Sequence, residues 1–123
     1  MQLSHLEKIG IIVALTQTMT LADGRMEERT VHLMGLQNKF GISMAELQSY
    51  LSKGEDVFVV LQKMSDDKKI FLFQNLCVFL IGQNGRFTQE AQRILLSVSR
   101  AVHMNDALIQ KGLEQFKKLA ENQ

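Results

Sequence analysis

Residues 70–81 read Ile-Phe-Leu-Phe-Gln-Asn-Leu-Cys-Val-Phe-Leu-Ile and form the most apolar stretch of the chain. Phe and Val favour strands, but the length of this stretch and the start signal before it, Ser65-Asp66-Asp67, favour a helix. A helix that is apolar nearly all the way round normally lies at the centre of a fold, covered by its neighbours. The 12 residues are too few to span a membrane, which takes about 20 apolar residues.

A first helix is predicted near the start of the chain. Ser4 and Glu7 have the spacing of a capping box, in which each side chain binds the backbone N–H of the other residue. The helix stops near Asp23-Gly24, because glycine accepts the positive φ that a turn needs. Its apolar residues make one stripe: Ile9, Ile12, Val13, Thr16 and Met19.

A second helix follows the turn at Gly24. It begins near Met26 or Glu27, since acidic residues suit the positive end of a helix dipole, and it ends around Phe40-Gly41. The residues that we expect to face inward are Val31, Met34 and, with them, Leu33.

Four more starts complete the pattern. Ser43 caps a short third helix that Gly54 ends, Asp56 starts a short fourth, Thr88 opens a sixth, and Asn105 caps the last. Apolar staples are expected between Ile42 and Leu47 and between Met104 and Ile109. With the helix after Ser65, the sequence predicts an all-α fold of about seven helices.

The chain contains an internal repeat. Asp23-Gly24-Arg25-Met26 returns 61 residues later as Asn84-Gly85-Arg86-Phe87, and the same shift pairs Leu33 with Ile94 and Met34 with Leu95. The segments of about 9–43 and 70–105 each hold a long apolar helix, a tight turn and a second helix. Either hairpin alone would expose an apolar face. We therefore predict two pseudo-repeated helical hairpins packed around the central apolar helix, in a single domain spanning 1–123.

The amino-acid composition argues against several classes of protein. Fourteen Lys and Arg against 13 Asp and Glu give a formal charge of +1, without the basic excess typical of nucleic-acid binders. A single cysteine excludes an intrachain disulfide. The first residues lack the cationic start of a secretory signal. The chain is expected to be cytoplasmic, with no membrane span. Lys63, Lys68 and Lys69, around Asp66 and Asp67, are expected to be a solvated, charge-mixed helix start.

The two turns also carry a family resemblance. Leu21-Ala22-Asp23-Gly24-Arg25-Met26 followed by Glu27-Glu28, together with Asn84-Gly85-Arg86-Phe87, resembles the tellurite-resistance TerB-like family. Phe40-Gly41-Ile42 is similar to that family's usual helix ending, and the resemblance covers about 9–105. It implies a wholly helical fold and a small, non-catalytic ion- or partner-binding module associated with tellurite or other metal stress. Two departures are Asn84, where aspartate is usual, and Arg29, where glutamate is common.

The first turn also holds the best candidate for a metal site, formed by Asp23, Glu27, Glu28 and His32. Residues four apart share a helix face, so Glu28 and His32 could present an oxygen and an imidazole to a divalent metal ion. The competing interpretation needs no metal ion. The side chain of Asp23 stabilises the turn, and the negative charges of Glu27 and Glu28 interact favourably with the positive end of the helix dipole. Calcium binding by an EF-hand is rejected. Aligning Gly24 with the invariant loop glycine places Met19, Leu21 and Thr30 at ligand positions.

Catalysis is not predicted. Cys77 lies within the most apolar helix, where a thiol is buried and inert, and His5 and His103 are expected to be isolated. No glycine-rich phosphate loop is present in the sequence. Nucleophile, base and orienting residue cannot be assembled from the remaining residues, so the prediction is that the chain is not an enzyme.

The alternative function is a metal-free helical protein-interaction module, similar to TerB-like domains attached to DnaJ-type co-chaperones. Its partner would be an unknown protein, or a second copy if the surface of residues 71–79 were left uncovered. The seven methionines either fill gaps between helices or form an adaptable peptide-binding surface.

Overall fold

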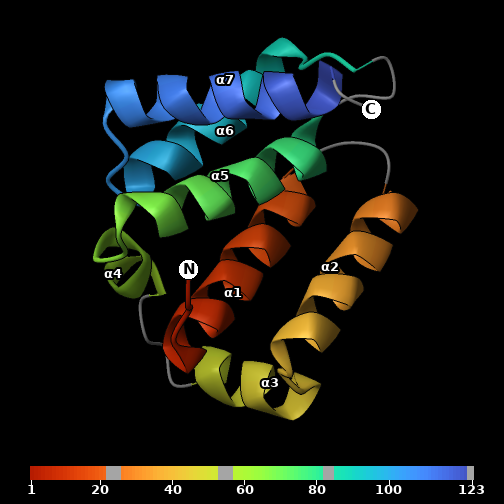
Figure 1. Cartoon of the computed structure of the whole chain (residues 1–123). Coiled ribbons are helices and arrows are strands. Elements are labelled where there is room, and N and C mark those ends of the chain that lie inside the picture. Colours follow the sequence, from red (N-terminus) through yellow and green to blue (C-terminus); the bar gives the residue numbers. More distant parts are fainter. Residues whose placement is uncertain (22–25, 53–56, 82–84, 122–123) are drawn as a thin grey trace.

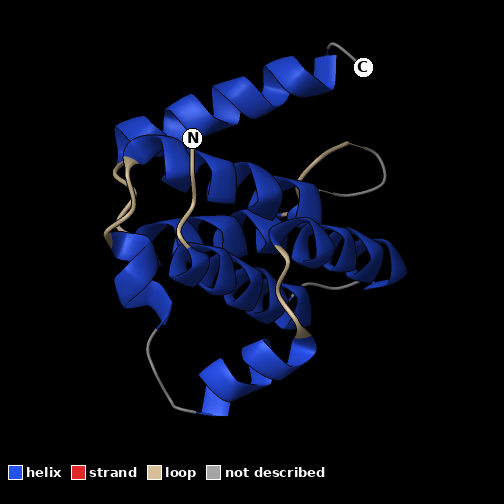
Figure 2. Ribbon diagram, turned by 60° about the horizontal axis from the view of Figure 1, so that its bottom comes forward, coloured by secondary structure: helices blue, strands red, loops and turns tan. Residues whose placement is uncertain are grey.

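The described part of this chain is built from helices. The computed structural model describes residues 1–21, 26–52, 57–81 and 85–121, and within these ranges there is no strand (Figure 2). The helices are α1 His5–Leu21, α2 Met26–Phe40, α3 Met44–Ser52, α4 Val57–Gln62, α5 Asp66–Leu80, α6 Gln89–Ala101 and α7 Asp106–Glu121. The prediction of an all-α fold with about seven helices is confirmed.

α1 and α5 form the centre of the fold (Figure 1). α1 contacts α2, α4, α5 and α6, whereas α5 contacts α1, α6 and α7. Within α5, Phe73 and Cys77 have no exposed surface. α1 is buried at every residue from 9 to 15, so the single stripe predicted for it is too narrow. Both long apolar helices, and not α5 alone, are therefore central.

The two predicted hairpins are present and touch each other. α1 lies beside α2, α5 lies beside α6, and the hairpins meet where α1 contacts α5. At that contact the Lys68 ammonium donates to Glu7 Oε1 over 2.9 Å. These residues lie 61 positions apart, so they are equivalent in the repeat. A bond between equivalent residues is expected where two related halves face each other.

The repeat extends beyond the hairpins into the third helix of each half. α2 ends in a Schellman motif, with Gly41 at φ 69°, and α6 ends in the same motif, with His103 at φ 64°. In each case the N–H groups that follow the helix donate back to its last carbonyls, at 3.0 to 3.1 Å. Ser43 and Asn105 then cap α3 and α7, respectively. The linkers 41–43 and 103–105 are thus equivalent.

Local start signals are largely confirmed. Glu7 N–H donates to Ser4 Oγ and Ser4 N–H donates to Glu7 Oε1, as a capping box requires. Thr88 Oγ1 accepts from the N–H of Ala91 at the start of α6. Ser65 precedes α5 but makes no capping bond through its side chain. The predicted boundaries at Asp23-Gly24, Gly54 and Asp56 lie outside the described residues.

The inward face predicted for α2 is partly wrong. Leu33 is buried as expected, but Val31 and Met34 are 71% and 58% exposed. The buried stripe consists of Arg29, Leu33 and Leu36, which are spaced i, i+4, i+7. Apolar residues occur on both faces of α2, and the true inner stripe includes a charged residue. The pattern of apolar residues alone therefore assigns the wrong residues of α2 to the core.

The basic pair at the start of α5 is also not a solvated helix start. Lys68 binds Glu7, and Lys69 is buried with its ammonium 3.3 Å from the carbonyl oxygen of His103. Both lysines therefore join α5 to other elements. The surface of residues 71–79, considered for self-association, is mostly covered, with Val78 as its exposed member.

Candidate functional site

The residues predicted as metal ligands do not come together in the described part of the chain. Glu27 and Glu28 are exposed in the first turn of α2, whereas His32 is half-buried. Asp23 lies outside the described residues. Among the residues that are described, no three His, Cys, Asp or Glu side chains form a group able to hold a metal ion. The four-residue metal site stays a prediction.

His32 is engaged with α5. Its Nε2 lies 3.1 Å from Asn75 Oδ1, and its ring meets the edge of Phe79 at a centroid distance of 5.3 Å. Asn75 Nδ2 donates to the carbonyl of Phe71, which fixes Oδ1 as the atom facing the imidazole. Because Oδ1 can only accept, His32 Nε2 carries the proton. That nitrogen is not available to a metal while this bond is made.

Arg29 caps the C-terminal end of α5 from α2. Its side chain is 6% exposed, and Nε donates to the carbonyl oxygen of Phe79 at 2.5 Å. The last four carbonyls of a helix lack partners within the helix, and a cation there also favours the dipole. α5 has no basic residue in its own last turn. Arg29, which departs from the family's usual glutamate, therefore has a structural role between two helices.

Met26 is exposed in the first turn of α2, and the outward side of the helix carries two further exposed apolar residues, Val31 and Met34, which we call the α2 face. Glu27, also exposed, lies on the same side of the helix as these two residues. Figure 1 shows the N-terminal part of α2 at the edge of the molecule, with no drawn element on its outer side. This surface was not predicted, because Val31 and Met34 were expected to face the core.

A groove of about 310 Å³ runs between α6 and α7. Phe87 borders it, and the ring of Phe87 lies 6.1 Å from that of Phe116, centroid to centroid. The other lining residues are Gln92, Leu95, Leu96, Ile109, Leu113 and Lys117. Its lining is mainly apolar.

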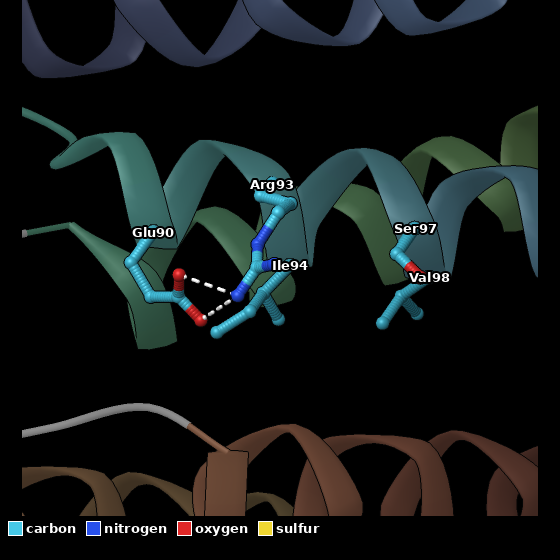
Figure 3. Close-up of a pocket in the computed structure, with 5 residues that line it drawn as sticks. All are labelled: Glu90, Arg93, Ile94, Ser97 and Val98. Atoms are coloured by element: carbon cyan, nitrogen blue, oxygen red, sulfur yellow. Dashed lines mark hydrogen bonds and ion pairs between the residues drawn. The ribbon is translucent and has the colours of Figure 1, made fainter.

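Two other hollows carry polar groups. Between α1 and α3, a hollow of about 510 Å³ is lined in part by His5 and Glu46, whose Nε2 and Oε2 are 2.9 Å apart. The prediction that His5 is isolated is therefore wrong. On α6, a hollow of about 290 Å³ is bordered by Glu90 and Arg93, which form an exposed ion pair at 2.6 Å (Figure 3). In Figure 3 its lining side chains point from α6 toward the ribbon of the first hairpin.

Cys77 has the inert setting that the sequence predicts. Its side chain has no exposed surface, and burial raises the pKa of the thiol to about 12. A nucleophilic cysteine needs the thiolate, which is scarce at neutral pH with such a pKa. The imidazole of His32, on the neighbouring α2, is bound to Asn75.

Comparison of the chain with protein-family models, with curated proteins and with solved structures finds no match. The TerB-like resemblance of the two turns therefore stays a prediction. Across the described ranges, no helix has both the length and the apolar character needed to cross a membrane.

Proposed function

We propose that this chain is a non-catalytic helical protein-interaction module that works without a bound ion. The observation that carries the proposal is the α2 face, where Val31 and Met34 are 71% and 58% exposed on an ordered helix. Adjacent exposed apolar side chains on one helix face are typical of surfaces that bind another protein. Methionine suits such a surface, because its flexible thioether adapts to partners of different shape.

Site-specific photo-cross-linking in cells tests this function. A photoreactive amino acid is placed at position 34 in one variant and at position 110, an exposed glutamine of α7, in a control variant. We expect one protein to cross-link from position 34 and not from position 110. The complex rebuilt from the purified proteins should then survive a chelator. Absence of a cross-link specific to position 34 would contradict the proposal.

Ion binding, which the TerB-like resemblance implies together with metal stress, stays a separate prediction, as does the cytoplasmic location expected from the sequence. Native mass spectrometry of protein purified without chelator reports any retained metal ion. Replacing Asp23 and Glu28 by Asn and Gln should abolish retention if those carboxylates are ligands. The same double variant should bind the cross-linked partner normally if the interaction needs no ion. Loss of partner binding in the double variant and in chelator would favour the ion-dependent function.

A further inference from the structure

We infer that the groove between α6 and α7 binds a small amphipathic anion, such as a medium-chain carboxylic acid. The carboxylate would lie at Lys117, and the alkyl chain would lie between the two helices. This ligand site is separate from the α2 face and does not depend on the proposed interaction function. The position of α7, the lining of the groove and the placement of charge around it support the same ligand.

α7 is held in place by α5. Both α6 and α7 pack against α5, whereas α6 and α7 are not among the described helix pairs in extensive contact. On its α5 side, α7 approaches so closely at Gly112 that an added methyl group would lie 2.7 Å from the Phe73 ring. A shift of α7 toward α6 would give up this contact. The groove of about 310 Å³ is therefore a pre-formed space, with a volume at the lower end of the range of small-molecule sites.

The lining of the groove is graded from buried to accessible. Leu95 and Ile109 are 3% and 5% exposed and form its inner part, whereas Leu96 is 36% exposed and lies nearer to solvent. Phe87 and Phe116 are half-buried, and their ring contact marks one end of the groove. An alkyl chain in this space would leave water for surroundings of its own character, which is favourable.

Positive charge lies at the end of the groove that the two rings mark. Lys117 directly follows Phe116, and it is the charged residue among the described residues of the lining. Phe87 directly precedes Thr88, the N-cap of α6, so the positive end of that helix dipole lies at the same end. An anionic head group is therefore favoured at this end, with the alkyl chain directed toward Ile109.

Acidic side chains of the two helices are turned to other partners. Glu90 accepts from Arg93 at 2.6 Å, and Glu114 accepts from Gln110 at 3.4 Å. None of these four residues lines the groove. A ligand carboxylate at Lys117 is therefore not opposed by either glutamate, and the complementary charge gives the site its preference for an anion.

The closed end of the groove favours a small ligand over a protein segment. The rings of Phe87 and Phe116 lie 6.1 Å apart, centroid to centroid, and join the start of α6 to the last part of α7. A partner helix, about 10 Å across with its side chains, would meet this ring pair and could not continue past it. A single alkyl chain needs no such exit, and one negative charge matches the one lysine of the described lining.

The test uses decanoate, added below its micelle concentration to the full chain. We expect saturable binding by calorimetry, chemical-shift changes confined to α6 and α7, and a Tm that rises with decanoate concentration because the ligand binds the folded chain. Acetate, which has the carboxylate without the chain, should not bind at the same concentrations. Leu96→Glu should weaken binding roughly tenfold or more, because it places a like charge beside the ligand. Val78→Glu, at an exposed apolar residue of α5 outside the groove, is the matched control and should leave the affinity unchanged.

Two neighbouring lysines test the role of charge. Lys117→Gln should weaken binding roughly threefold at low salt, as expected for one exposed ion pair, and the difference should shrink as salt is raised. Lys118→Gln, which removes a charge outside the lining, should have less effect. No saturable binding at millimolar decanoate, equal effects of the two lysine variants, or shift changes centred on α2 would overturn the inference. Each of these results would leave the cross-link from position 34, and with it the proposed function, unaffected.

Discussion

Replacing Gly112 by alanine tests how closely α7 approaches α5. A methyl group at position 112 would lie 2.7 Å from Cδ1 and 3.0 Å from Cε1 of Phe73. The Phe73 ring has no exposed surface, so it cannot swing into solvent. Overpacking of this kind costs about 1–3 kcal/mol, whereas alanine gains about 1 kcal/mol over glycine inside a helix. We expect Gly112→Ala to lower the free energy of unfolding by up to about 2 kcal/mol.

Gly35→Ala is the matched control. Gly35 lies within α2, is exposed, and would place a methyl group with nothing within 4 Å. The gain in helix propensity should then appear alone, as a stabilisation of about 1 kcal/mol. Thermal and urea unfolding should show the two variants moving in opposite directions, by roughly 3–5 °C in Tm for each kcal/mol in a chain of this length.

The double variant Gly112→Ala, Phe73→Leu isolates the contact itself. Leucine is smaller than phenylalanine, so part of the crowding caused by the added methyl group at position 112 should be relieved in the double variant. The free energies of unfolding should then be non-additive, with a coupling of about 1 kcal/mol or more between the two sites. If Gly112→Ala stabilised the chain as much as Gly35→Ala does, the close packing of α7 on α5 would be refuted.

Three further predictions concern a linker, an ion pair and the thiol. His103→Gly should raise Tm and Gly41→Ala should lower it, each by the equivalent of about 1 kcal/mol, because both positions have positive φ and the Cβ added at Gly41 contacts nothing within 4 Å. Burial raises the pKa of Glu7, but hydrogen bonds from Lys68 and Ser4 outweigh burial and lower it below 4.5. The stability that Glu7 contributes should therefore be present above pH 4.5 and lost as the pH falls through its pKa in the folded chain. Urea unfolding measured at several pH values should show that the free energy of unfolding of the Glu7→Gln variant depends less on pH than that of the unchanged chain. Cys77 should stay unmodified by a thiol reagent at about pH 8 in the folded chain and react once in denaturant; modification of the folded chain would contradict its burial.

Much of the fold could be predicted because its signals are local. The capping pair of Ser4 and Glu7, the cap at Asn105 and the glycine at 41 each act on the turn where they occur. The repeat then showed that two helical units had to share a core. The sixth helix was expected to run from Thr88 toward His103, but the left-handed conformation of His103 was not predicted, because glycine usually takes that conformation.

The contacts between distant segments could not be predicted in the same way. Arg29 binds the carbonyl of Phe79, 50 residues away, and His32 meets Asn75, 43 residues away. Neither pair has a spacing that marks it in the sequence. A charged residue on the buried stripe of α2 also contradicts the usual pattern, since arginine is seldom buried. The assignment of Val31 and Met34 to the core failed for that reason.

The asymmetry between the two halves links the fold to the proposed function. Both halves use the same long helix, the same second helix and the same linker, but the third helix continues for 16 residues in α7 and stops after 9 in α3. In the second half α7 packs against α5, whereas in the first half the separate short helix α4 packs against α1. The two halves therefore cover their long central helices in different ways, while Val31 and Met34 of the α2 face stay exposed. The α2 face is for this reason the surface on which the proposed partner binding is tested.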